Sequence, residues 1–231
     1  MKRSEINLIM KNAVEFFNEQ NFHLPQFAFW SIDEWNKRET EIEKIIENKL
    51  GWDITDYGSG NFSEIGLIHF TIRNGNPKDV KKGGIPYCEK VMIIEEGQKL
   101  PLHHHKNKIE DIINRGGGIL EVKLYSISEG DKLGKETLHV YCDGVEKVLE
   151  SGKTIELLPG ESITITPDFF HTFSAKQGNG KVLLGEVSSV NDDYGDNKFL
   201  VKVQRFIEIE EDDTPLYLLY NDYEKYIKSK N

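Results

Sequence analysis

The sequence is poor in cysteine and has no long apolar run. Two cysteines, Cys88 and Cys142, occur in 231 residues, too few for the disulfide framework of a small secreted domain. Glu5, Lys11 and Glu15 interrupt the apolar N-terminus, and no small-residue cleavage site follows, so no signal peptide is expected. No stretch approaches the ~18 apolar residues of a membrane span. We therefore expect a cytoplasmic protein with no membrane partner.

Positive charge is also in deficit. Lys and Arg total 29 against 39 Asp and Glu, which gives a formal net charge of −10. Such a chain repels nucleic acid at long range, and no nucleic-acid partner is expected. A hydrophobic content of 38% with 10% aromatic residues is typical of a globular chain. The length fits one domain that carries a helical extension.

The first fifty residues have a helical pattern. Apolar residues recur at helical spacing between positions 6 and 17, and Ser4 is placed to cap this helix, which is expected to end near 23–25. The spacing of Ser31 and Glu34 fits a capping box that begins a second helix. Gly51 is placed as the C-terminal glycine of that helix. Residues 1–50 are therefore predicted to form a helical extension, packed on a barrel formed by residues 51–231.

After residue 51, short β-rich runs alternate with turns. The predicted strands cover residues 67–73, 90–94, 119–127, 137–142, 153–157, 162–166, 182–190 and 200–206. Asp143-Gly144 and Ser151-Gly152 have the composition of hairpin turns. The acidic run 208–213 is interpreted as a solvated loop, and a short helix is expected at 222–228. Closely spaced strands without long helices between them favour a mainly β fold, an antiparallel sandwich or a jelly-roll barrel.

The most informative stretch contains His103, His104 and His105. If residues 101–105 are extended, His103 and His105 point to one face and His104 to the other. Glu110 lies five residues further on, across an expected turn, and His171 follows a predicted strand. In an antiparallel barrel these positions can meet. We therefore predict a metal site formed by His103, His105, Glu110 and His171.

Three imidazoles and one carboxylate suit Mn, Fe, Co, Ni or Zn better than Mg or Ca. In an octahedral site, four protein ligands leave two positions that can chelate adjacent oxygens of a substrate. The competing interpretation is a surface polar cluster with adventitious metal affinity. His23, His69 and His139 lack such neighbours in the sequence, and they are interpreted as ordinary surface or satisfied core histidines.

The spacing of the predicted ligands resembles the two cupin motifs. The first motif, G-x5-H-x-H-x4-E-x5/6-G, is matched by Gly97, His103, His105, Glu110 and Gly116. The second motif is matched at Pro167 and His171, whereas Phe169 replaces its glycine and Ala175 its terminal asparagine. The resemblance implies a cupin jelly-roll β-barrel with the N-terminal α-helical extension.

Longer segments resemble the D-lyxose isomerase family of cupin-type sugar isomerases. They are residues 87–90, 108–118, 185–193 and 205–212, and the likeness covers nearly the whole chain. The resemblance implies a manganese-dependent aldose–ketose isomerase that interconverts D-lyxose with D-xylulose and D-mannose with D-fructose. It also implies a small-molecule sugar as the partner and a homodimer as the assembly. Other divalent transition metals, such as Co2+, are expected to substitute for Mn2+.

Five further charged residues are candidates for catalysis and sugar binding. Glu186 is favoured as the base because it follows an apolar strand, so it can point into a dry interior where burial raises a carboxylate pKa. Lys108, between two predicted ligands, is a candidate acid–base or oxygen-polarising group. Lys90, Asp193 and Arg205 are candidates for binding sugar hydroxyls. Each of the five also has a structural interpretation as a solvated or ion-paired charge.

One base acting on one face suits a cis-enediol mechanism, and a metal-assisted hydride shift is the competing route. Phe169, Phe170 and Phe173 are interpreted mainly as barrel core, with an apolar wall beside the sugar as the alternative. The glycines at 116–118 lack the strand–loop–helix context of a phosphate cradle and are interpreted as a turn or bulge. Together with the net charge, this favours a neutral sugar over a sugar phosphate.

Three rival functions stay open at this point. A cupin dioxygenase would hold Fe through the same ligands, and a cupin phosphosugar isomerase would need a phosphorylated substrate. A non-enzymatic cupin would bind a sugar or a metal without converting it. No DNA-binding helix pair or basic patch accompanies the predicted barrel, which counts against a transcriptional regulator.

Overall fold

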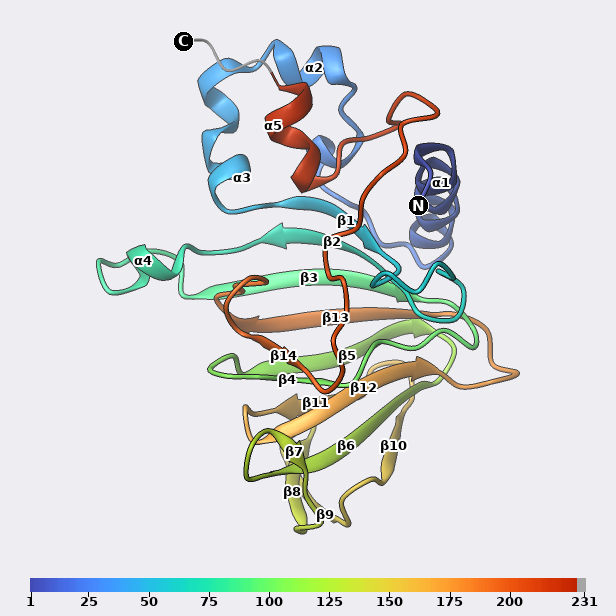
Figure 1. Cartoon of the computed structure of the whole chain (residues 1–231), viewed down its shortest axis with the longest axis vertical. Coiled ribbons are helices and arrows are strands. Elements are labelled where there is room, and N and C mark those ends of the chain that lie inside the picture. The colour runs from blue at the N-terminus through green and yellow to red at the C-terminus, as the bar shows by residue number, and fades with distance from the viewer. Residues whose placement is uncertain (228–231) are drawn as a thin grey trace.

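The computed structural model describes residues 1–227, with the side chains of residues 39 and 40 left aside. It confirms the prediction of a mainly β fold with a helical N-terminus (Figure 1). The strands are β1 (Gly51–Thr55), β2 (Leu67–Arg73), β3 (Tyr87–Ile94), β4 (His103–His105), β5 (Glu110–Gly117), β6 (Leu120–Ser128), β7 (Lys132–Leu133), β8 (Leu138–Cys142), β9 (Val145–Leu149), β10 (Thr154–Leu157), β11 (Ser162–Ile165), β12 (Phe169–Ala175), β13 (Val182–Ser189) and β14 (Asn197–Phe199). The helices are α1 (Arg3–Glu19), α2 (Ile32–Asn36), α3 (Glu43–Glu47), α4 (Pro77–Val80) and α5 (Tyr223–Tyr226), with short 3-10 turns η1 (Gln26–Phe29), η2 (Glu39–Ile42) and η3 (Tyr220–Asp222).

The strands form two antiparallel sheets. One sheet has eight strands in the order β1-β2-β3-β13-β5-β11-β8-β9, and the other has the order β10-β6-β12-β4-β14, with β7 paired to β6. Strands that are distant in the chain are neighbours in both sheets, which is the pattern of a jelly-roll barrel rather than of a simple meander. Figure 1 shows α1, α2, α3 and α5 gathered at the β1 end of the molecule, away from β8 and β9, whereas α4 lies at one side, between β2 and β3 in the chain.

The space between the sheets holds the main apolar core, which includes Ile94, Ile112, Leu124 and Ile163. Because side chains alternate along a strand, the opposite faces of β1, β2, β3 and β13 need a second cover. The apolar face of α1 packs there, in a cluster that includes Phe17 of the helix. These strands are therefore apolar on their outer face, and their inner face is free to carry polar residues.

The helix predictions need three corrections. The N-cap of α1 is Lys2, and Ser4 lies within the first turn, where its amide and hydroxyl donate to Asp212. The Ser31–Glu34 capping box is confirmed, but the expected single helix is broken into α2, η2 and α3. The residue in the left-handed region after α3 is Lys49, with φ of 52°, so Gly51 is not the C-terminal glycine and begins β1 instead.

The acidic run 208–213 is a loop with exposed carboxylates, as predicted, and part of it also pairs with the start of α1. The Arg3 side chain is fully buried, and its guanidinium bonds to Glu211 at 2.8 and 2.9 Å and to Asp222 at 2.9 and 2.8 Å. Carboxylates near a helix N-terminus also meet its partial positive charge. The helix expected at 222–228 is α5, and position 228 lies outside the described residues.

The strand prediction for residues 200–206 is wrong. This segment is irregular, and single bonds hold it to the region of β1: the Gln204 amide donates to Tyr57 O, and Thr55 Oγ1 donates to the Arg205 carbonyl. The Asp143-Gly144 hairpin is confirmed between β8 and β9. Ser151-Gly152 is a turn between sheets rather than a hairpin, because β9 pairs with β8 and β10 with β6.

The glycines at 116–118 accompany a bulge where the register of β13 against β5 shifts, as predicted. Within residues 1–227, no helix combines the length and the apolar character needed to cross a bilayer.

Candidate metal centre and active site

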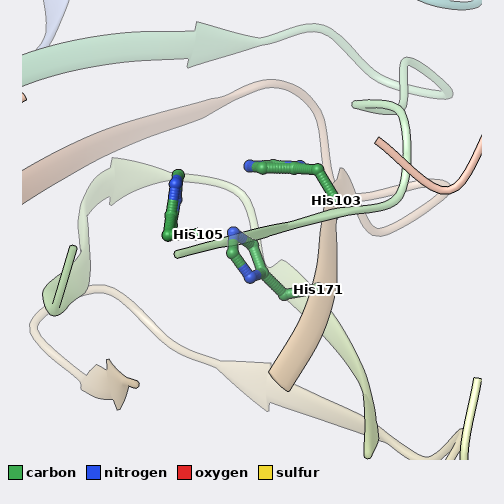
Figure 2. Close-up of side chains that lie close together, drawn as sticks. All are labelled: His103, His105 and His171. Carbon is green, nitrogen blue, oxygen red and sulfur yellow. The ribbon is translucent and has the colours of Figure 1, made fainter. Parts of the chain in front are cut away.

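Three imidazoles converge in the interior between the two sheets (Figure 2). His103 of β4 and His171 of β12 are direct cross-strand partners, with ring centroids 4.2 Å apart. His105 lies two residues along β4, 5.2 Å from each of the other rings. One nitrogen from each ring lies within 4.8 Å of the others. The three side chains together can hold a metal ion.

The alternation of side chains along β4 produces this arrangement. His103 and His105 face the interior, as predicted, whereas the ring of His104 makes an edge-to-face contact with Phe170, with centroids 4.6 Å apart. His171 follows the strand that ends at residue 165, as predicted, but not directly. It lies within β12, because residues 166–168 turn the chain from the eight-stranded sheet into the six-stranded one.

Glu110 reaches the imidazoles from the facing sheet, where it is the first residue of β5. Its Oε1 lies 3.1 Å from His171 Nε2 and its Oε2 lies 3.4 Å from His105 Nε2. The carboxylate is 2% exposed. Burial would raise its pKa, but the ammonium group of Lys108 and the neighbouring His105 hold it well below the ordinary value. Glu110 is therefore a carboxylate anion beside three imidazoles.

The hydrogen bonds of the imidazoles fit a bound cation. His103 Nδ1 bonds to Pro101 O at 2.9 Å and His171 Nδ1 to Phe169 O at 3.4 Å, whereas Asp196 Oδ2 lies 3.5 Å from His105 Nδ1 without a hydrogen bond. Such partners favour the tautomer whose Nε2 lone pair is free to bind a metal. Burial lowers the pKa of His103 and of His105, which keeps both rings neutral.

Orphaned atoms give independent support for the fit. Among the described residues, His105 Nε2, His171 Nε2 and Glu110 Oε1 are buried without a hydrogen-bond partner. Buried polar groups are rarely left unsatisfied. A divalent transition-metal ion would use all three atoms, and nitrogen with carboxylate oxygen is a donor set that suits such ions.

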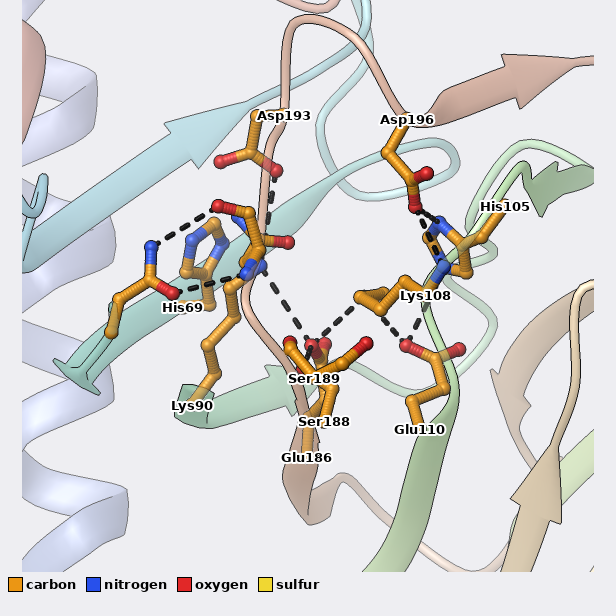
Figure 3. Close-up of polar contacts among 12 residues, drawn as sticks. His69, Lys90, His105, Lys108, Glu110, Glu186, Ser188, Ser189, Asp193 and Asp196 are labelled. Atoms are coloured by element: carbon orange, nitrogen blue, oxygen red, sulfur yellow. Dashed lines mark hydrogen bonds and ion pairs between the residues drawn. The ribbon is translucent and has the colours of Figure 1, made fainter. Parts of the chain in front are cut away.

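Lys108 and Glu186 form the polar centre of the pocket beside the imidazoles (Figure 3). Lys108 Nζ lies 2.6 Å from Glu110 Oε2 and 2.9 Å from Glu186 Oε1. Glu186 also accepts a bond of 3.0 Å from Ser188 Oγ. Glu186 lies on the inner face of β13 and is 4% exposed, whereas Lys108 comes from the loop between β4 and β5.

The expectation that burial raises the pKa of Glu186 is wrong in its net result. Burial does act in that direction, but Lys108 and Lys90 outweigh it and lower the pKa below the ordinary value. For Lys108, burial would lower the pKa, and the charges of Glu110 and Glu186 raise it instead. At neutral pH the pocket therefore holds an ionised carboxylate beside an ammonium group.

The remaining predicted residues continue this network. Lys90 Nζ lies 3.9 Å from Glu186 Oε1 and 3.8 Å from Asp193 Oδ1. Arg205 lies 3.9 Å from Asp193 Oδ1 and pairs closely with Asp53 Oδ2. The structure thus brings Glu186, Lys108, Lys90, Asp193 and Arg205 to one pocket, which His103, His105 and Glu110 also line.

The charged side chains of this network carry more negative than positive charge, and a bound cation can offset the difference. It contains three cations and four carboxylates, a net charge of −1. The cations are Lys90, Lys108 and Arg205, and the carboxylates are Asp53, Glu110, Glu186 and Asp193. The Asp196 carboxylate, 3.5 Å from His105 Nδ1, adds a further negative charge, and a divalent ion at the imidazoles would offset this excess.

Several pocket residues were not predicted. Asp196 accepts bonds from the backbone N–H groups of Asn107 and Lys108 at 2.9 and 3.2 Å, which shapes the loop between the ligands. Tyr57 and Phe199, with rings 5.8 Å apart, form an apolar wall. Of the three phenylalanines considered from the sequence, Phe173 lines the pocket.

His69 was interpreted as an ordinary core or surface histidine, but it lines the pocket and its Nε2 has no partner among the described residues. The sequence feature that could have identified His69 is a single imidazole on the inward-facing side of the otherwise apolar strand 67–73.

Two curled antiparallel sheets that enclose three imidazoles and a carboxylate define a cupin-type barrel with a candidate metal centre. A sequence model of the D-lyxose isomerase family matches residues 1–223. The chain therefore belongs to the D-lyxose isomerase family.

Two relatives match along their whole length. The D-lyxose/D-mannose isomerase of Serratia proteamaculans is 43% identical over 230 residues, with 98% of this chain and 100% of the relative covered. The D-lyxose/D-mannose isomerase of Escherichia coli O157:H7 is 42% identical over 231 residues, with the same coverage.

The fold is shared with crystal structures of L-ribose isomerases. The enzyme of Acinetobacter sp. DL28, in complex with L-ribose, superposes with a TM-score of 0.57 at 17% identity. That of Cellulomonas parahominis, with L-ribose, gives 0.56 at 13% identity. In both cases 91% of this chain and 98% of the other chain are covered. At this identity the likeness concerns the fold alone.

Proposed function

We propose that this protein is a metal-dependent aldose–ketose isomerase of neutral sugars, which interconverts D-lyxose with D-xylulose and D-mannose with D-fructose. The observation that carries the proposal is one buried pocket in which a candidate metal-ligand set faces an ionised carboxylate and an ammonium group. Membership of the D-lyxose isomerase family and the named activity of the two relatives support the choice of sugars.

The proposed ligands are His103, His105, Glu110 and His171, and the proposed metal is Mn2+, with other divalent transition metals such as Co2+ as substitutes. The neutral imidazoles and the orphaned nitrogens support this set. When bound, the ion supplies Lewis acidity that polarises the sugar carbonyl and stabilises charge that develops on its oxygens. The identity of the metal rests on the family resemblance.

Glu186 is the proposed base, which moves a proton between C1 and C2 on one face of a cis-enediol. It is ionised at neutral pH, because Lys108 and Lys90 lower its pKa, so the acceptor form is fully populated. Its burial keeps bulk water away from the carbon acid. Lys108 is the proposed partner that stabilises the carboxylate and polarises a sugar oxygen, since its Nζ lies 2.9 Å from Glu186 Oε1.

Lys90, Asp193 and Arg205 are proposed to bind the remaining sugar hydroxyls. Each of the three already has an oppositely charged partner at 3.9 Å or closer, and these paired groups offer donors and acceptors without excess charge. The pairing of all three pocket cations, Lys108 included, disfavours a phosphate dianion. This supports neutral sugars over the phosphosugar alternative.

A homodimer in the cytoplasm is the proposed form of the enzyme. The family resemblance supports the dimer, and exposed apolar side chains at β8 and β9, namely Tyr141, Val145 and Val148, offer a surface for it. Two free and buried cysteines are compatible with a reducing compartment. Light scattering should give a mass of about twice 26.6 kDa, and a monomer mass at working concentration would contradict the dimer.

The metal site is tested by comparing two histidines of the same strand. His103→Ala removes a predicted ligand, whereas His104→Ala removes an equally buried ring that faces Phe170. We expect His103→Ala to lose both bound metal and ketose formation, and His104→Ala to keep both. Metal content by mass spectrometry and conversion of D-lyxose would be measured on folded protein. Equal loss in both variants, or full activity of His103→Ala, would contradict the assignment.

A further inference from the structure

His69 is a buried polar residue without a structural task. It lies on β2 and is 2% exposed, and its ring lines the same pocket as the candidate catalytic groups. Its strand neighbours Ile68 and Phe70 pack outward against the α1 cluster. Among the described residues, Nε2 of His69 has no hydrogen-bond partner. A buried donor or acceptor that is left unmade costs stability, so a ligand is the natural partner.

A second buried nitrogen without a partner, Nη1 of Arg205, belongs to the group that binds the carboxylate beside His69. This carboxylate is Asp53, whose Oδ2 is 3.8 Å from His69 Nε2, too far for a hydrogen bond. The same oxygen is bound closely by Arg205 Nη2, while Arg205 Nη1 is buried without a partner in the described part of the chain. Two unsatisfied nitrogens therefore lie near a single carboxylate oxygen, in a side of the pocket that the proposed proton transfer does not use.

The chemistry of this side fits a hydroxyl group rather than an anion. Burial lowers the pKa of His69 to about 4, so the ring is neutral at pH 7 and offers one donor and one acceptor. The charge of Arg205 is already met by Asp53 and Asp193. A neutral imidazole and a compensated guanidinium match a ligand group that both donates and accepts hydrogen bonds.

The position of His69 relative to the metal site indicates which end of the sugar lies near it. Figure 3 shows His69 and His105 on opposite sides of Lys90 and Glu186. Under the proposed function, on which this inference rests, C1 and C2 of the sugar lie at the imidazole side, near Glu186. The open chain then extends past Lys90, and its far end meets His69 and Arg205.

We propose that His69 Nε2 and Arg205 Nη1 bind the hydroxyl on the last carbon of the open-chain sugar, and that His69 thereby determines the preference for sugars that carry this hydroxyl. His69 acts in specificity, because it contacts the substrate away from the reacting carbons. A site built to hydrogen-bond a substrate hydroxyl rejects the analogue that lacks it.

The test compares D-lyxose with 5-deoxy-D-lyxose on the metal-loaded enzyme. The wild type should prefer D-lyxose in kcat/KM by about tenfold or more. His69→Leu should lower kcat/KM for D-lyxose by about tenfold with little change for the deoxy sugar, so that the preference largely disappears. His69→Gln, whose amide can reach the position of Nε2, should keep more of the preference than the shorter His69→Asn. If the leucine variant does not fold, the comparison of His69→Gln with His69→Asn still tests whether a donor at the position of Nε2 sets the preference for D-lyxose.

Differences in the ring forms of the two sugars cancel, because both sugars are offered to every protein and only the change in preference is compared. His139→Leu makes the same replacement at a histidine that pairs with Glu146 on the surface, and it should leave the preference unchanged. A His69→Leu variant that loses activity equally on both sugars would assign His69 a structural role and overturn the inference. A wild type that converts both sugars equally would also overturn it, whereas a wild type that converts neither would overturn the proposed function itself.

Discussion

Replacing Glu186 with glutamine keeps the size of the side chain but removes its ability to accept a proton. Positioned general bases contribute typically 10²- to 10⁴-fold, which corresponds to about 3 to 5.5 kcal/mol of barrier. We expect kcat to fall within this range. The stability cost should stay below the roughly 3–5 kcal/mol of a fully orphaned buried charge, since Lys108 keeps Glu110 at 2.6 Å and Lys90 keeps Asp193 at 3.8 Å.

The assay would measure ketose formation from D-lyxose at saturating Mn2+, together with metal content and urea unfolding. Glu89→Gln is the matched control, because Glu89 lies beside Val187 on the neighbouring strand and pairs with Arg73 outside the pocket. The control should keep kcat within about twofold of wild type. Turnover in D2O should place solvent deuterium on the product carbon if Glu186 exchanges its proton. A folded, metal-loaded Glu186→Gln enzyme with wild-type kcat would refute the reasoning and favour a hydride shift.

Two further predictions concern stability. His69 has a folded-state pKa lowered from 6.5 to about 4 by burial, so unfolded chains bind more protons than folded ones between these values and the folded state is weakened as pH falls. His69→Leu should remove about 2 kcal/mol of the stability difference between pH 6.5 and pH 4.5, measured by urea unfolding at the two pH values, and an unchanged difference would count against a neutral buried ring. Arg3→Met should destabilise the fold by about 3–5 kcal/mol, because it leaves the buried Asp222 carboxylate without its cationic partner and removes the ion pair with Glu211. The exposed pair of Lys2 should matter by at most about 1 kcal/mol in Lys2→Met, and equal effects of the two variants would contradict the anchoring role of Arg3.

Local rules were enough to predict how the ligand strand is arranged. Alternation along an extended segment places His103 and His105 on one face and His104 on the other, as the structure has them. The same rule turns Glu186 inward on β13. These outcomes depend on residues within a few positions of one another, so they can be deduced without knowledge of the topology.

Long-range contacts were the part that the sequence could not supply. The burial of Glu186 was foreseen, but the sign of its pKa shift depends on Lys108 and Lys90, which lie 78 and 96 positions away in the chain. Arg205 lies in a segment wrongly predicted as a strand, and single bonds to Tyr57 and Thr55 bring it into the pocket. His69 was missed because its neighbour Asp53 belongs to another strand.

The most direct test of the central claim is ketose formation by metal-stripped protein, with and without added Mn2+. Protein treated with EDTA and shown to remain folded would be incubated with D-lyxose and with D-mannose. The account predicts no ketose without metal and rapid formation of D-xylulose and D-fructose once Mn2+ is restored. Equal conversion with and without metal would contradict the assignment of the imidazole site, and no conversion by folded, metal-loaded protein would contradict the isomerase itself.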